Sequence, residues 1–521
     1  MFKTSGPQTP VDLAELSEDT LAIAEAQPAP NSIAHAPEKH PYRGSGTEDD
    51  PYIVEFHHND PRNPHNFSIA RRWLYTAIAT ISVLAVTLTS AAYTGSAIEV
   101  REEFGASTEV FATGVAVYVL GFAVGPCMWA PLGELYGRRI WFIITHIGAI
   151  AFMAGSAGAN SMTTLIIFRF ITGVFAASPL TNSGGIIADL FPSSERGTGL
   201  ALFSCAPSIG PALGPIVGGF VSESVGWRWV HGVCAIFTFV IFIIGCFLMP
   251  ETYAPVILSN EAARLSRESG DVYKSRIQAD SGKKSPRQVF AHALKRPWQL
   301  LFVEPIIFII AVYLSILYGT LYMFLGAFPI VYQEERGWSE GIGGLSFIGM
   351  MVGMIIGMIY LVTFDISYRK KGDNQPPEAR LPPALVGAVC IPIGMFSFAW
   401  TTFPSIHWSA SIILSSLFGF GMVLEFVSLL NYIIDAYVIY AASALAATAM
   451  MRSFFGTAFP LFTSKMYHGL GVHWASSIPA FLTLVCMPFS FWLIKKGPEI
   501  RMRCKYAKEA AMILAELQET D

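Results

Sequence analysis

Apolar runs of about 20 residues, separated by short polar breaks, recur along most of this chain. A helix needs about 20 apolar residues to cross the hydrocarbon core of a bilayer, and it satisfies its own backbone hydrogen bonds there. Only 14% of the residues are charged, whereas a soluble domain usually has about 25%. The pattern therefore predicts an all-α integral membrane protein.

The runs number about twelve and fall into two groups of six. The predicted spans are 74–94, 108–130, 140–159, 162–188, 198–221, 229–249, 301–328, 340–363, 383–403, 409–434, 444–463 and 474–494. We predict a disordered tail over 1–70, a six-helix bundle over 71–249, a central loop over 250–299, a second bundle over 300–494 and a tail over 495–521.

Basic residues gather on one side of the predicted membrane. The central loop is rich in Lys and Arg, and the loops that share its side hold Arg138, Arg139, Arg369 and Lys370. The opposite loops hold few basic residues. Because Lys and Arg accumulate on the cytoplasmic side, both termini and the central loop are predicted to be cytosolic.

Motifs of catalysis are not found in the sequence. The seven cysteines form no C-x-x-C pair or Cys/His cluster, so neither a metal site nor a disulfide framework is indicated. No G-x-x-x-x-G-K-[ST] phosphate loop and no nucleophile–base arrangement stands out. We therefore expect that the protein is not an enzyme and that it has no cofactor and no nucleic-acid partner.

The two groups of spans repeat each other weakly. Glu134 stands four residues before Arg138 after the second span, and Asp365 stands four before Arg369 after the eighth. Asp189 and Asp435 end the fourth and tenth spans, each followed at equal distance by a glycine. Such symmetry is expected of a transporter that rocks two bundles around a site near the membrane midplane.

The fifth span contains the most specific pattern in the chain. Residues 210–219 read G-P-A-L-G-P-I-V-G-G. Small residues four apart let two helix backbones approach closely, and proline removes a helical hydrogen bond and bends the helix. The pattern is formed by Gly210, Gly214, Pro215, Gly218 and Gly219.

These motifs resemble the major facilitator superfamily, and more narrowly its fungal twelve-span drug:proton antiporters, over about residues 60–500. Residues 210–219 fit the antiporter motif G-x-x-x-G-P-x-x-G-G, which the family ties to export. Residues 131–139 are similar to the loop motif G-x-x-x-D-R-x-G-R-R, with Glu134 in place of Asp and proline in place of the first glycine. The resemblance implies two pseudo-symmetric six-helix bundles.

Residue roles follow from the same resemblance. It implies a conformational latch in which Glu134, Arg138 and Arg139 interact with Asp189 and with the start of helix 11. It also implies that Arg169, within the fourth span, takes part in proton coupling. Ordinary turn geometry for the first group, and an arginine reaching the membrane surface for the second, remain alternative interpretations.

A polar stripe on the tenth span gives a candidate proton site. At 100° per residue, Glu425, Ser428, Asn431, Tyr432 and Asp435 share a sector of about 120°. Such a stripe should face protein or water rather than lipid, so Glu425 is the best candidate for exchanging a proton in the cavity. The alternative is a structural carboxyl bonded to a neighbouring helix.

Further candidates lie on the seventh and eleventh spans. Tyr318 and Tyr322 are one turn apart, and their rings can stack on a planar or cationic substrate or simply pack. Arg452 is predicted to lie near Asp435, either as a gate or as packing.

The prediction is a monomeric, multi-pass plasma-membrane antiporter that uses protons to export a drug, toxin or secondary metabolite by alternating access. Three alternatives stay open. A polyamine exporter of the same fold would need several acids in the cavity, where mainly Glu425 is found. A nutrient symporter lacks the expected P-E-S-x-x-R ending of helix 6, and a transport-dead sensor usually has a long cytosolic extension.

Overall fold

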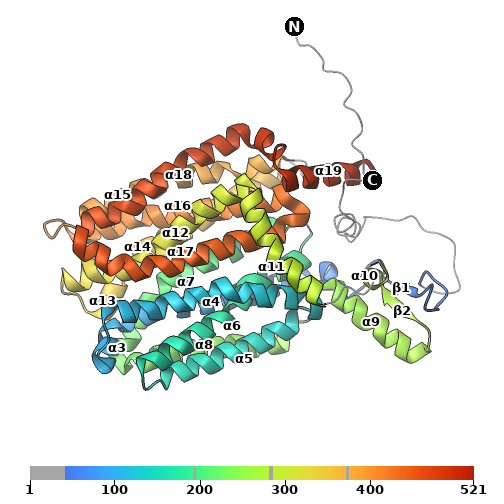
Figure 1. Ribbon diagram of the computed structural model, residues 1–521, viewed down its shortest axis with the longest axis horizontal. Helices are drawn as coiled ribbons and strands as arrows, with labels where there is room; N and C mark the ends of the chain where they lie inside the picture. Colours follow the sequence, from blue (N-terminus) through green and yellow to red (C-terminus); the bar gives the residue numbers. More distant parts are fainter. Residues whose placement is uncertain (1–41, 193–194, 281–285, 371–374, 521) are drawn as a thin grey trace, which may run out of the picture. The chain divides into compact units, whose positions relative to one another are not determined.

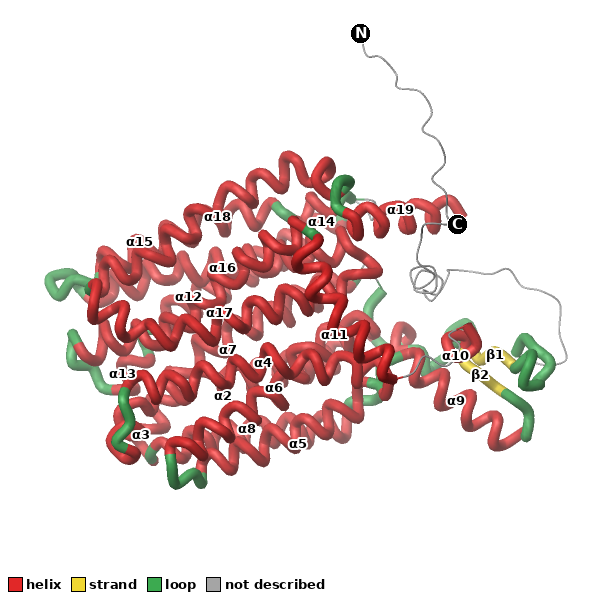
Figure 2. The backbone as a smooth tube through the Cα atoms, in the orientation of Figure 1, coloured by secondary structure: helices red, strands yellow, loops and turns green. Residues whose placement is uncertain are grey.

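Long apolar helices make up most of the chain (Figures 1 and 2). The computed structural model describes residues 42–192, 195–280, 286–370 and 375–520. The predicted tail over 1–41 therefore lies outside the described residues. The helices group into one large compact unit, 56–257 with 286–510, in which both predicted bundles lie.

Six long helices form the first half. They are α2 (Ile69–Ala92), α4 (Thr108–Tyr136), α5 (Arg138–Ala157), α6 (Met162–Leu190), α7 (Arg196–Val225) and α8 (Trp227–Leu248), with the short helices η2 (Pro64–Asn66), η3 (Tyr93–Ser96) and α3 (Ala97–Phe104). Serine side chains cap α2, α4 and α6 by accepting a hydrogen bond from a first-turn N–H. Glycines with positive φ, Gly137 and Gly226, make the turns into α5 and α8.

The second half repeats this plan. Its elements are α11 (Pro286–Val303), α12 (Pro305–Pro329), η4 (Ile330–Glu334), α13 (Glu340–Gly344), α14 (Phe347–Arg369), η5 (Pro377–Arg380), α15 (Pro382–Thr401), α16 (Trp408–Tyr437), η6 (Val438–Tyr440), α17 (Ala441–Leu470), α18 (Val472–Arg501) and α19 (Lys505–Thr520). Pro305 stands at the first position of α12, where its missing N–H leaves no hydrogen bond unmade.

Twelve predicted spans correspond to twelve long helical segments, with α13 and α14 together forming the eighth. By length and hydropathy, eleven of the described helices could cross a membrane. The helix outside this group is α17, although it has 30 residues. Arg452, Lys465 and several serine and threonine residues lower its hydropathy, which it can tolerate because it packs against α4 and α12.

A second, smaller compact unit includes the described residues 42–55, 258–280 and 511–520. In it, β1 (Tyr52–Val54) pairs in parallel with β2 (Tyr273–Ser275), near α10 (Arg276–Asp280) and part of α9 (Ala254–Ser269). Tyr273 packs its ring against Tyr42 and Tyr52. Part of the segment predicted as a disordered tail thus forms a strand, because the central loop provides its partner.

The two halves meet mainly through two helices of the first half. The helix α4 packs on α17, and α7 packs on α13 and α14. We call the end of the large unit at Gly137, 191–192 and 375–381 the basic end, after Arg138, Arg139 and Arg380, and the end at 93–107, 225–227 and 330–340 the acidic end, after its glutamates.

Candidate transport site

A hydrogen-bonded chain of hydroxyls joins α2 of the first half to α12 of the second half. The Ser90 hydroxyl of α2 donates to the carbonyl oxygen of Thr87 at 2.6 Å and lies 2.7 Å from the Tyr322 hydroxyl of α12. Because Ser90 has a single hydroxyl hydrogen, Tyr322 is the donor between the halves. Tyr318, one turn away, donates to Tyr322 at 3.5 Å.

Arg169 anchors this chain in the first half. Its side chain is 1% exposed. Its Nη2 donates to the carbonyl oxygen of Ser90 at 2.9 Å, and its Nε donates to that of Gly114 at 2.7 Å. The guanidinium lies 4.1 Å and 5.1 Å from the ring centres of Tyr93 and Tyr118. Arg169 is therefore buried in the helical core rather than directed to the membrane surface.

Arg452 lies on α17 in the second half. Its guanidinium lies 5.2 Å from the ring centre of Tyr318 and 5.5 Å from that of Phe426. Its Nε is buried without a hydrogen-bond partner. The expected pairing of Arg452 with Asp435 is wrong, because Asp435 instead binds Arg380 at 2.9 Å. We call Ser90, Arg169, Tyr318, Tyr322 and Arg452 the central cluster.

Glu425 of α16 faces α18 rather than the central cluster. It is fully buried, and its Oε1 accepts a hydrogen bond from Ser490 of α18 at 2.5 Å, while its Oε2 has no hydrogen-bond partner among the described residues. The neighbouring Phe426 is the residue that approaches Arg452. The carboxyl thus belongs to the interior of the second half, not to the central cluster.

The predicted polar stripe of α16 is split among several surroundings. Ser428 and Asn431 line a small cavity of about 20 Å³ beside Asp365 of α14. Tyr432 is fully buried. The stripe therefore does not face one cavity, because α16 is enclosed by α14, α15 and α17 on different sides.

Arg380 organises the basic end of the second half. Its Nη1 and Nε bind Asp365 and Asp435, each at 2.9 Å, and its guanidinium lies 4.3 Å from the ring centre of Tyr368. Asp365 also accepts a hydrogen bond from Thr198 of the first half at 2.8 Å. Arg380 was not predicted as a site residue, since nothing in its loop spacing distinguishes it from other basic residues.

Arg138 has the corresponding position in the first half. Its Nε lies 3.6 Å from Oδ2 of Asp189, and its Nη1 donates to Asn182 at 3.2 Å. Glu251, which was not predicted, accepts hydrogen bonds from the backbone N–H of Arg138 and of Arg139 at 2.8 Å and 3.0 Å. This carboxylate therefore caps the start of α5, where an anion is favoured.

Arg138 has neighbours other than the predicted latch residues. A Cβ on Gly137 would overlap the Glu251 carboxylate, so the turn requires glycine both for its positive φ and for space. The Arg138 guanidinium lies 4.9 Å from the ring centre of Tyr253, whose pKa burial raises to about 12. Glu134, the other predicted member, is exposed.

The glycines of α7 lie against two different neighbours. A Cβ on Gly210, Gly214 or Gly218 would overlap atoms of α2. A Cβ on Gly219 would meet the carbonyl oxygen of Glu340 at 2.5 Å, across the interface between the halves. The first three glycines thus pack α7 against α2 in its own half, whereas Gly219 allows close contact with the other half.

The acidic end is also closed by bonds between the halves. Oε1 of Glu340 accepts a hydrogen bond from Ile98 N–H at 2.7 Å. Glu223 accepts one from Gly341 N–H at 2.9 Å. Because Thr198 and Asp365 join the halves at the basic end, the structure has contacts on both sides of the central cluster.

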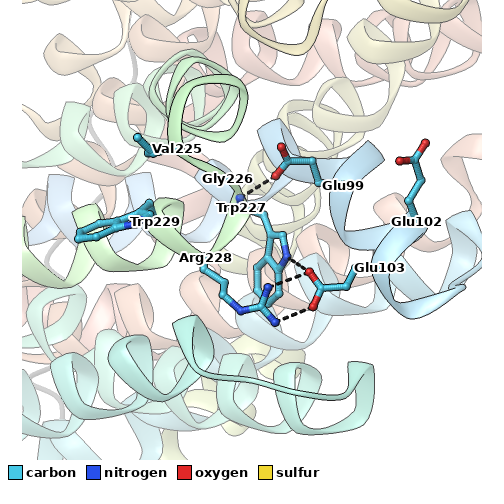
Figure 3. Close-up of a pocket in the computed structure, with 8 residues that line it drawn as sticks. All are labelled: Glu99, Glu102, Glu103, Val225, Gly226, Trp227, Arg228 and Trp229. Atoms are coloured by element: carbon cyan, nitrogen blue, oxygen red, sulfur yellow. Dashed lines mark hydrogen bonds and ion pairs between the residues drawn. The ribbon is translucent and has the colours of Figure 1, made fainter.

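A larger cavity of about 650 Å³ opens at the acidic end of the first half (Figure 3). Glu103 accepts hydrogen bonds there from Trp227 Nε1 at 2.7 Å and from both Nη atoms of Arg228, while Glu99 accepts from the Trp227 N–H. Figure 3 shows Glu102 apart from this network. These residues come from the first half alone.

Known protein families and sequences resemble this chain over most of its length. Residues 78–460 match the Major Facilitator Superfamily. The chain is 56% identical to the major facilitator-type transporter sorT of Penicillium rubens over 94% of this chain and 95% of that one. It is 51% identical to the major facilitator superfamily multidrug transporter mdrA of Aspergillus fumigatus (92% and 80% covered) and 50% identical to the efflux pump FUB11 of Gibberella moniliformis (92% and 81%).

Among solved structures, the proton:xylose symporter XylE matches with a TM-score of 0.60 at 16% identity, covering 82% of this chain and 97% of that one. This similarity supports the fold alone. The chain belongs to the major facilitator superfamily, among its fungal drug-efflux transporters, and it is a multi-pass membrane transporter of small compounds rather than an enzyme.

Proposed function

We propose that the protein exports a small organic compound, such as a drug, toxin or secondary metabolite, across the plasma membrane in exchange for protons. The observation that carries this proposal is the complete glycine motif of α7, whose last member, Gly219, lies directly against the other half. Relatives named as efflux pumps support export. Both termini and the basic end are cytosolic in this proposal.

Alternating access is supported by the bonds at both ends. If the bonds of Glu340 and Glu223 break while those of Asp365 persist, the centre opens at the acidic end; the reverse opens the basic end. The central cluster lies between these two sets of contacts. A substrate held there would face one side of the membrane at a time.

Glu425 is the proposed proton carrier. It is a fully buried carboxyl. One oxygen accepts a hydrogen bond from Ser490, and the other has no hydrogen-bond partner among the described residues. Such a group is stable in the membrane interior only while its surroundings suit its protonation state, so opening of the second half to water would let it exchange a proton.

Three dyes test export in fungal cells with and without the protein: rhodamine 6G as a cation, carboxyfluorescein as an anion and Nile red as a neutral compound. We expect faster efflux of at least one dye, and we expect a proton uncoupler to abolish the difference. Efflux that persists with the uncoupler would contradict proton coupling. Equal retention of all three dyes would contradict export.

A further inference from the structure

Two arginines in the central cluster lack an acidic partner. Among the described residues, neither Arg169 nor Arg452 forms an ion pair. Arg169 keeps Nη1 without a hydrogen bond, and Arg452 keeps Nε without one. Arg169 is buried and Arg452 is half-buried. A charge in the membrane interior is costly unless it is paired, and such an arginine usually marks a functional site.

The nearby carboxylates are engaged elsewhere. Glu425 is directed to Ser490 of α18. Glu304 accepts hydrogen bonds from the Tyr437 hydroxyl and the Tyr506 N–H at 2.9 Å and 2.8 Å, near the basic end. Asp365 and Asp435 are bound to Arg380. The central positive charge is therefore not balanced by a described side chain.

The two arginines differ in how firmly hydrogen bonds hold their guanidinium groups in place. Arg169 is fixed by two backbone carbonyls and by the rings of Tyr93 and Tyr118. Arg452 lies against the rings of Tyr318 and Phe426, and its Nε has no hydrogen-bond partner among the described residues. A guanidinium with free donors beside aromatic rings suits a planar carboxylate, because it can donate two parallel hydrogen bonds while the rings stack on the apolar part.

We propose that the central cluster binds its substrate as an organic anion, with the carboxylate on Arg452 and a flat apolar portion against Tyr318 and Phe426. This assignment rests on the proposed function, because it takes the central cluster as the transport site. It disfavours a polyamine as cargo, since two unpaired guanidiniums would repel a polycation.

Three ligands that share one ring system separate charge from shape: naphthoate, naphthamide and naphthylmethylammonium. Binding to the full-length protein in nanodiscs is measured by titration calorimetry. We expect naphthoate to bind at least about tenfold more tightly than the amide, which is the usual gain from hydrogen bonds to a charged group, and the ammonium to bind most weakly.

Substitution of the arginine then tests the residue. R452Q should bring naphthoate to the affinity of the amide, whereas R452K, which keeps the charge but loses the planar donor fork, should retain part of the preference. R264Q removes an exposed arginine that binds Glu261 and Glu268 on its own helix, and it should change nothing.

Two results would overturn the assignment. One is naphthoate that binds the unaltered protein no more tightly than the amide, or not at all. The other is a full preference for naphthoate in R452Q. Uncoupler-sensitive efflux of any dye without a preference for naphthoate leaves the proposed function standing, whereas a preference for naphthoate without such efflux removes proton-coupled export.

Discussion

At the scale of single residues, the interior of this protein holds charge in two distinct ways. Arg380 and Arg138 are matched by aspartates at the basic end. Among the described residues, Arg169 is matched by carbonyl oxygens and aromatic rings, and Arg452 by aromatic rings. Paired charges stabilise one arrangement of helices, while an unmatched buried charge is available to a ligand.

Replacing Glu425 with Gln tests the proton carrier. Glutamine keeps the size of the side chain and can still accept the hydrogen bond from Ser490, but it cannot release a proton. We expect uncoupler-sensitive dye efflux to fall at least about tenfold with the amount of membrane protein unchanged. E102Q, which alters an exposed carboxyl, is the control. Normal efflux in E425Q would remove Glu425 from the mechanism.

Replacing Asp189 with Asn tests the latch. Both side chains of the pair with Arg138 are less than one fifth exposed, so its loss should cost about 1–3 kcal/mol of stability. We nevertheless expect a several-fold slower efflux, because the pair is proposed to form and break during each cycle. Thermal unfolding and efflux measured on the same preparation separate the two effects. Efflux that declines only in proportion to the folded protein would make the pair structural.

At the scale of elements, α7 links the packing of the first half to its contact with the second. Its glycines bring the backbone against α2 on one face and against α13 on the other. Without side chains at these positions, the two backbones approach at a distance that no alanine permits. The position of α13, and with it the bond from Gly341 to Glu223, depends on this approach.

Replacing Gly218 with Ala should separate α7 from α2, because the added Cβ would overlap the carbonyl oxygen of Ala92. Overpacking of this kind typically costs about 1–3 kcal/mol. We expect a lower melting temperature and loss of most efflux. In G184A the added Cβ meets Phe203 at 3.6 Å, an ordinary contact, so this control should behave like the unaltered protein. Equal melting temperatures for G218A and G184A would contradict the packing argument.

At the scale of the whole molecule, the fold is the part that the sequence predicts best. Apolar length fixes where each helix crosses, and the described helices follow the predicted spans within several residues. The glycine motif of α7 could also be recognised in the sequence, because close packing depends on local spacing. Partners across helices were not: Glu425 binds Ser490, 65 positions away, and Asp435 binds Arg380 rather than Arg452.

The reason is geometric. Helical periodicity tells which residues share a face, but the neighbours of that face depend on how all the helices pack. Tyr93 and Tyr118 enclose Arg169 from two other helices, and no sequence spacing relates them. The unmatched charge of the central cluster is therefore visible only in three dimensions.

Movement between the halves can be tested with one added cysteine. The Cys127 sulfur of α4 lies 3.8 Å from the Met450 sulfur of α17, toward the basic end. In M450C, oxidation should join the halves by a disulfide and stop efflux, and a reductant should restore it. C127S/M450C should be insensitive to the oxidant. Undiminished efflux by the cross-linked protein would contradict separation of the halves at this end.

The most direct measurement of the whole account uses the purified protein in sealed vesicles loaded with the same three dyes. A pH step is imposed across the membrane, and dye movement is followed with and without an uncoupler. The account predicts that at least one dye moves against the direction of proton flow, that the uncoupler stops it, and that E425Q vesicles resemble protein-free ones. No dye movement above that of protein-free vesicles after the pH step would contradict it.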